Sequence, residues 1–124
     1  MLGLMIATAL AQGTPMPAPQ WRSIERAPGG EVFVDTASLR RDRDTFEILV
    51  RIIFTGVQRS GMARGITRNR YFCATRTFLT LHVHYVDANG GTLEDRPARG
   101  AAARERPVTP GSPNEKILAD YCPR

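Results

Sequence analysis

The chain has 124 residues, of which 42% are apolar and 23% are charged, and its formal net charge is +5. This length suits one domain with one modest core, and the apolar content excludes wholesale disorder. The sixteen arginines and one lysine are scattered among acidic residues, which argues against specific nucleic-acid binding and leaves weak affinity for acidic polymers open.

The N-terminus carries an apolar run from Leu2 to Ala11. It ends in Ala9-Leu10-Ala11, the small-x-small pattern that signal peptidase cuts. The run has about half the ~20 residues that a transmembrane helix needs. We therefore predict a signal peptide over residues 1–11, with cleavage before Gln12 and no transmembrane segment. No Lys or Arg precedes the run, so the α-amino group or an upstream start supplies the positive end, and a buried N-terminal helix is the alternative.

The apolar run is followed by a proline-rich segment. No cysteine stands after the run as an acceptor for a lipid anchor, so we expect a periplasmic or secreted protein. Residues 12–20, QGTPMPAPQ, contain three prolines and predict an extended spacer. The folded domain is then expected over residues 21–124.

From Trp21 onward the apolar residues alternate with period two, which predicts strands. WRSIER and EVFVD form two strands around the turn Ala-Pro-Gly-Gly, and DTASLRRDRD predicts a turn with one loose helical turn begun by Asp35. TFEILVRIIFT is the clearest strand, with one apolar face made of Phe46, Ile48, Val50, Ile52 and Phe54. This pattern is typical of an antiparallel sheet with one covered side. Trp21 and Tyr71 are expected in the core.

The middle of the chain predicts a loop and two more strands. GVQRSGMARG is expected to be a flexible loop, and it lacks the Gly-Lys-Ser/Thr ending of a phosphate-binding loop. ITRNRYFCATRT and TFLTLHVHYVD follow as strands, the second with Leu79, Leu81, Val83 and Tyr85 on one face and Thr80, His82 and His84 on the other. An Asn-Gly turn closes this strand. We expect the segment Arg96–Thr109 to form an exposed loop that contains at most a short edge strand.

The last segment predicts the only helix of the domain. Ser112 is a natural N-cap, Pro113 follows it, and Glu115 completes a capping box. Ile117, Leu118 and Tyr121 then face the sheet. A helix of about ten residues is marginal alone, so something must hold it in place.

Cys73 and Cys122 are the only cysteines, too few for a structural zinc site. A disulfide between them would hold the helix, and for this loop length it stabilises the fold by about 4 kcal/mol. Such a bond fits an exported protein. The alternative is two buried, unpaired thiols.

His82 and His84 are the only histidines and, two residues apart on a strand, lie on one face. They are the candidate metal ligands, but a catalytic zinc needs a third protein ligand, and no nearby Asp, Glu or Cys shares that face. We favour the interpretation that the two histidines lie on a solvated face of the sheet and bind no metal. No serine stands in a recognisable nucleophile turn, so we predict no catalytic residue and no cofactor.

Several of these segments resemble bacterial surface-adhesin protein E-like domains. They are the Trp-containing first strand with EVFVDTASLRRD, the cysteine of YFCATRT, and PGSPNEKILADYC, so the resemblance spans Trp21 to Cys122. It implies a single small α+β domain, an antiparallel sheet with a short C-terminal helix tied to it by Cys73 and Cys122. The chain departs from these domains in lacking a lipid-acceptor cysteine and an aromatic residue before Pro-Gly-Ser.

The sequence therefore predicts an exported, non-enzymatic binding domain of the bacterial envelope. Its partner, a protein or an envelope component, is specified by no motif, and exposed sheet edges would allow a homodimer. Two alternatives stay open: a small metal-binding protein or enzyme using His82 and His84, and an arginine-driven polyanion binder using the Arg-rich loops.

Overall fold

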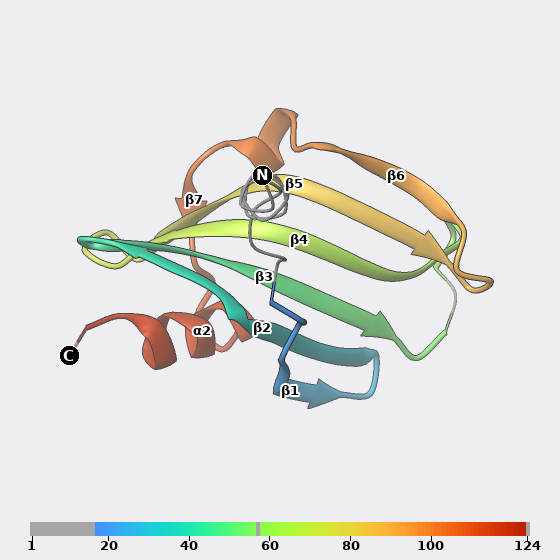
Figure 1. The fold of residues 1–124 in the computed structure, drawn as a ribbon, viewed down its shortest axis with the longest axis horizontal. Helices are drawn as coiled ribbons and strands as arrows, with labels where there is room; N and C mark the ends of the chain where they lie inside the picture. Colours follow the sequence, from blue (N-terminus) through green and yellow to red (C-terminus); the bar gives the residue numbers. More distant parts are fainter. Residues whose placement is uncertain (1–16, 57, 124) are drawn as a thin grey trace, which may run out of the picture.

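The protein folds into one antiparallel sheet with a short helix against it (Figure 1). The computed structural model describes residues 17–56 and 58–123, so the predicted signal peptide and the first half of the spacer lie outside the described residues. The elements are β1 Trp21–Ala27, β2 Gly30–Asp42, β3 Thr45–Phe54, β4 Met62–Phe72, β5 Thr77–Asp87, β6 Thr92–Pro97, the 3₁₀ helix η1 Gly100–Ala103, β7 Arg106–Pro107 and α2 Pro113–Tyr121.

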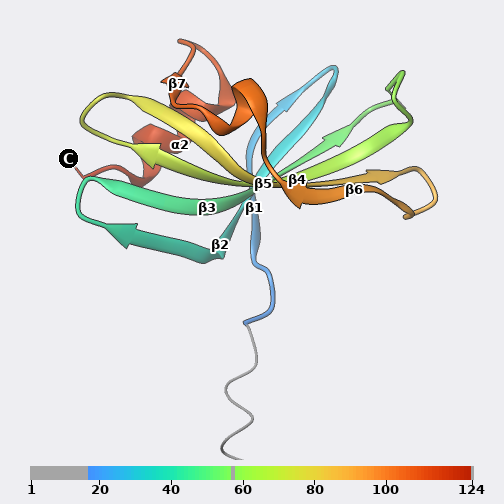
Figure 2. The same ribbon diagram turned by 90° about the horizontal axis from the view of Figure 1, so that it is seen from above.

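Strands β1 to β6 lie in the sheet in chain order, and each runs antiparallel to its neighbour. The two-residue strand β7 pairs with the start of β5. Figure 2 shows α2 and β7 on one side of this sheet and the segment leading into β1 on the other. We call the side that carries α2 the helix face and the opposite side the open face. The predicted α+β class, with one sheet and one C-terminal helix, is confirmed.

The core lies where α2 packs on the helix face. Phe46, Ile48 and Val50 of β3 are at most 5% exposed, as the alternation in that strand predicts. The ring of Tyr71 stacks between Phe46 at 5.0 Å and Phe78 at 5.7 Å, measured between ring centroids. From the helix come the buried side chains Ile117, Leu118 and Tyr121.

The disulfide joins the end of α2 to the sheet. Cys73 and Cys122 are bonded, with 2.19 Å between their sulfur atoms. Cys73 lies in the turn directly after β4, where its N–H donates to the carbonyl of Asp44, and not inside a strand as predicted. Because this turn stands at the end of the sheet, the bond fixes the last turn of the helix over the core.

The capping box predicted for α2 is wrong in its partners. Ser112 occupies the N-cap and Pro113 the first turn, but the Ser112 hydroxyl donates to the carbonyl of Thr109 at 2.6 Å. Glu115 instead accepts the N–H of Gly111 at 3.0 Å. In the tight turn before the helix, in which Gly111 has φ of +79°, Ser112 thus bonds back to Thr109, and Glu115 accepts an N–H one residue before the expected one.

The loose helical turn predicted after Asp35 is absent, because β2 continues to Asp42 through a bulge between Asp35 and Arg40. The Ser38 hydroxyl explains this. It donates to the carbonyl of Asp35 at 2.7 Å and accepts the N–H of Leu49 at 2.9 Å. A side chain thus replaces the missing backbone contact to β3, and the strand is not interrupted.

The faces predicted for β5 are wrong in its first half, where Leu79 lies on the open face and Thr80 on the helix face. The pairing with β4 skips Leu81, so this bulge places Thr80 on the same face as Val83. Thr80 is 6% exposed and donates to the buried Asn69 at 3.0 Å. A buried polar pair therefore occupies a position at which simple alternation requires an apolar residue.

Two loops are shorter than predicted. Strand β4 already begins at Met62, inside the segment expected to be flexible. Strand β6 includes Arg96 and Pro97, the first two residues of the segment expected to form an exposed loop. The short edge strand predicted within Arg96–Thr109 is β7.

Candidate binding site

The open face of the sheet carries a row of polar and aromatic side chains that no helix of the described residues covers (Figure 2). The strand register places Phe33, Arg51, Ile66 and His84 in one row across β2 to β5. The next row holds Asp35, Leu49, Arg68 and His82.

The centre of this face is an arginine held between two aromatic rings. The guanidinium carbon of Arg51 lies 4.3 Å from the ring centroid of Trp21 and 4.7 Å from that of Phe33. Trp21, expected in the core, is therefore only partly buried and lies on the open face. Burial, and after it the charge of Arg64, lower the pKa of Arg51. Two cation–π contacts thus stabilise a partly dehydrated cation.

Two further arginines flank Arg51 on the neighbouring strand. Because Arg51 pairs with Ile66, Arg64 and Arg68 are its two diagonal neighbours, a relation that separates side chains by about 7–8 Å. The buried Nε of Arg51 and Nη1 of Arg68 have no hydrogen-bond partner among the described residues. Unpaired buried donors cost stability, and like charges side by side add to that cost.

We define the arginine cluster as Arg40, Arg51, Arg64 and Arg68. Within the described part of the chain, none of the four has a carboxylate oxygen within 4.0 Å. Four carboxylates of the open face bond to other groups: Glu47 to Arg70, Glu31 to Ser23 and Arg26, Asp95 to His82, and Asp35 to the N–H groups of Gln20 and Ala37. The cluster therefore forms no direct ion pair among these residues, and the more distant charge of Glu31 offsets only part of the effect of burial on the pKa of Arg51.

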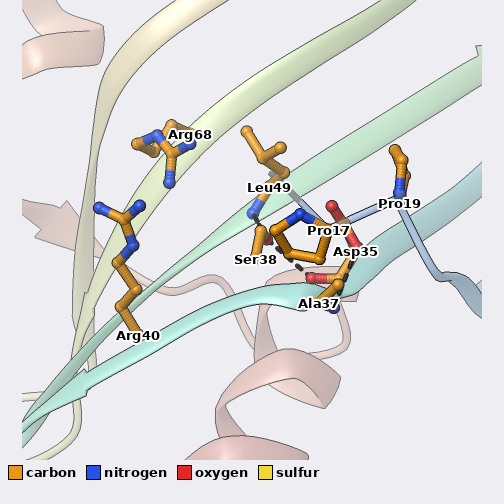
Figure 3. A pocket seen from close by; sticks show the side chains of 8 residues that line it. All are labelled: Pro17, Pro19, Asp35, Ala37, Ser38, Arg40, Leu49 and Arg68. Carbon is orange, nitrogen blue, oxygen red and sulfur yellow. Dashed lines mark hydrogen bonds between the residues drawn. The ribbon is translucent and has the colours of Figure 1, made fainter. Parts of the chain in front are cut away.

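A pocket of about 310 Å³ opens beside the cluster (Figure 3). The guanidinium groups of Arg40 and Arg68 gather on one side of it, and Pro17 and Pro19 lie on the other. Leu49 adds an apolar wall. The pocket combines cationic donors with apolar surface, which suits an acidic group beside the arginines. The Asp35 carboxylate also lines it and accepts the N–H groups of Gln20 and Ala37.

A second cavity, also about 310 Å³, lies on the helix face. Its polar groups form a connected network in which the Tyr71 hydroxyl donates to Asn114 at 2.6 Å and accepts from Asn69 at 3.2 Å. Burial raises the pKa of Tyr71 far above its ordinary value. Arg106 stacks over Phe78 and donates to carbonyls of η1. Because these groups bond to one another, we assign the network to the fold.

The two histidines share the open face as predicted, but a carboxylate that sequence spacing could not reveal joins them. His82 Nε2 lies 2.6 Å from Asp95 on β6, and His84 Nε2 lies 3.2 Å from the hydroxyl of Thr92. The hydrogen bond from His82 lowers the pKa of Asp95. Over residues 17–56 and 58–123, no three His, Cys, Asp or Glu side chains are grouped to hold a metal ion.

The arginine cluster itself was missed by sequence reasoning, which looked for arginines in loops. In the expected loop Arg96–Thr109, Arg96 bonds to Glu94 and Arg106 to the backbone. A signal did exist, because Arg64, Arg68 and Arg70 stand at even spacing and so share one strand face. Only the register with β3 adds Arg51 to them.

Comparison with known proteins gives the family. No curated protein matches the chain. Crystal form II of Haemophilus influenzae protein E is 10% identical, covers 87% of this chain and 98% of its own, and gives a TM-score of 0.47. The described helices include none long and apolar enough to cross a bilayer. The sequence profile described as surface-adhesin protein E matches residues 21–123, from the start of β1 to beyond the end of α2, and the chain therefore belongs to the surface-adhesin protein E family.

Proposed function

We propose that this chain is an exported, non-enzymatic binding domain of the bacterial envelope and that it holds its partner on the open face. Membership in the surface-adhesin protein E family supports a binding role outside the cytoplasm. The observation that carries the proposal is the arginine cluster, whose four guanidinium groups form no ion pair among the described residues. Arg40 and Arg64 are exposed, so a partner that supplies anionic acceptors could pair with the cluster from solvent.

The chemistry of the open face favours binding over catalysis. Both cysteines are in the disulfide, so neither is a nucleophile. The side chains of His82 and Asp95 are 44% and 58% exposed, whereas a catalytic acid–base pair usually works in a water-excluded site. Arginine stays charged at every physiological pH, which suits a binding group and not a proton-transfer group.

Export is supported by two independent features. Residues 1–11 have the pattern of a signal peptide. The Cys73–Cys122 bond ties the helix to the sheet, and structural disulfides persist in oxidising compartments such as the periplasm and the cell exterior. The partner is then a protein or another component of the envelope or its surroundings.

The proposal is tested by crosslinking in living cells. A photoreactive amino acid replaces Ile53, which is 39% exposed on the open face, in the full-length chain expressed in its native host. The control carries the same amino acid at the exposed Ala103 of η1, on the opposite side of the sheet. Illumination should give adducts of higher mass in the envelope fraction from position 53 only. Equal adducts from both positions, or a cytoplasmic protein, would contradict the proposal.

A further inference from the structure

We infer that the arginine cluster binds an acidic glycan, a linear sugar polymer that carries carboxylate or sulfate groups on successive units. This inference rests on the proposed function, because it names the ligand of the same open face. It depends on the charge of the cluster, the spacing of its members and the groups around it.

Charge gives the chemical class of the ligand. The four guanidinium groups have no carboxylate within 4.0 Å among the described residues. Residues 1–16 and Val57 contain no Asp or Glu side chain that could supply one. Guanidinium groups bind carboxylate and sulfate oxygens through pairs of parallel hydrogen bonds. An anionic ligand would therefore pair with guanidinium groups that form no ion pair within the described residues, and its charge would reduce the repulsion among Arg51, Arg64 and Arg68.

Spacing shows that one small anion cannot serve the whole cluster. Arg64 and Arg68 are four residues apart on β4, which is about 13 Å along a strand. Arg51 lies between them on β3, and Arg40 lies beyond Arg68 across the pocket. A ligand that contacts all four must carry several acidic groups along an extended chain.

The surroundings favour a glycan over a nucleic acid. Single-stranded nucleic acids stack their bases on free aromatic faces, but Trp21 and Phe33 already pack against Arg51. The margin of the cluster instead offers side chains that bond to hydroxyl groups, such as His84 and Thr92. The pocket beside Arg40 and Arg68 has an apolar wall at Leu49 and the size for one sugar unit. The acidic group of that unit would face the two arginines, and its hydroxyl groups would face Asp35, which also lines the pocket.

The test is retention on glycan columns. Heparin supplies sulfate groups and polygalacturonate supplies carboxylate groups alone, so the two probes distinguish the acidic group. The wild-type protein should be retained on at least one of them at 0.15 M NaCl. R64Q/R68Q should weaken binding at least tenfold and reduce the slope of log affinity against log salt by about two.

The matched control is R99Q/R104Q. It removes the same two charges from exposed arginines that flank η1, and it should elute close to the wild type. Equal losses in the two variants, or unchanged retention of R64Q/R68Q, would overturn the inference. So would tighter binding to duplex DNA or to polyglutamate than to both glycans. Should the double variant fail to fold, the single variant R64Q, at an exposed position, must weaken binding.

The two proposals fail in different ways. If the protein crosslinks through position 53 in the envelope but neither glycan column retains it, the glycan inference is wrong, and the proposal of an envelope binding domain is still supported. If a glycan column retains the protein through Arg64 and Arg68 but the protein is found in the cytoplasm of its host, the proposed function is wrong, and the glycan site is still supported.

Discussion

At the scale of single residues, the open face shows arginines in two different situations. Arg70 donates to Glu47 through Nε at 3.0 Å and Nη2 at 2.6 Å, so its charge is compensated. Arg64, on the same strand and the same face, has no such partner among the described residues and lies diagonal to Arg51. The first arginine therefore stabilises the fold, and the second is retained at a cost.

This contrast gives a prediction for two matched substitutions. Arg70→Gln should lower the free energy of unfolding by about 0.5–1 kcal/mol, because it removes a partly exposed ion pair. Arg64→Gln should leave it unchanged or raise it by a few tenths of a kcal/mol, because it removes a like charge beside Arg51. Urea unfolding followed by fluorescence of the single Trp21 measures both. A larger loss in Arg64→Gln than in Arg70→Gln would show that Arg64 has a structural role.

The residues that sequence analysis identified correctly were those whose role follows from a local pattern. Alternation in β3 gives Phe46, Ile48 and Val50 as core. His82 and Asp95 are thirteen residues apart and meet only through the pairing of β5 with β6. Local spacing contains no information on such a pair, and the same holds for Arg51 beside Arg64 and Arg68.

At the scale of elements, α2 depends on the disulfide and on its three buried side chains. Nine residues form a marginal helix alone. Two ion pairs also join the helix to β1, Arg22–Asp120 at 2.7 Å and Lys116–Glu25 at 2.8 Å. They lie at the surface, so each contributes little to the stability of the fold. The covalent bond is therefore the main constraint on the end of the helix.

Removing that bond should have a large effect. In Cys73→Ser/Cys122→Ser, the free energy of unfolding should fall by about 4 kcal/mol, because the sequence separation of 49 gives a long loop whose closure entropy returns to the unfolded chain. Hydrogen exchange should show α2 losing protection while β3 and β4 keep theirs. A loss below about 1 kcal/mol, or uniform loss of protection, would contradict this description of the helix.

Strand boundaries and faces follow the sequence pattern where polar side chains form no bonds within the sheet, and depart from it where they do. Strand β3 follows its pattern throughout. In β2, Ser38 bridges to Leu49 and carries the strand through residues that read as a turn. In β5, the bond from Thr80 to Asn69 accompanies a bulge that reverses the predicted faces. These side-chain contacts decide the local structure, and composition alone does not contain them.

At the scale of the whole molecule, the two faces of the sheet differ in what they do. The helix face holds the core, the disulfide-tied α2 and a bonded polar network. The open face holds the arginine cluster, two aromatic rings and a pocket. The fold class was predictable from the alternation of strands and the single capped helix. The arginine cluster of the open face was not, because it exists only once β2, β3 and β4 are in register.

The proposed function requires that the domain reaches an oxidising compartment, where the disulfide forms and the open face meets its ligand. The most direct test is the intact mass of the protein isolated from native cells, with and without reduction and alkylation. We predict a chain that begins at Gln12, carries no lipid and takes up two alkyl groups only after reduction. A full-length chain with two thiols that alkylate without reduction would contradict the account.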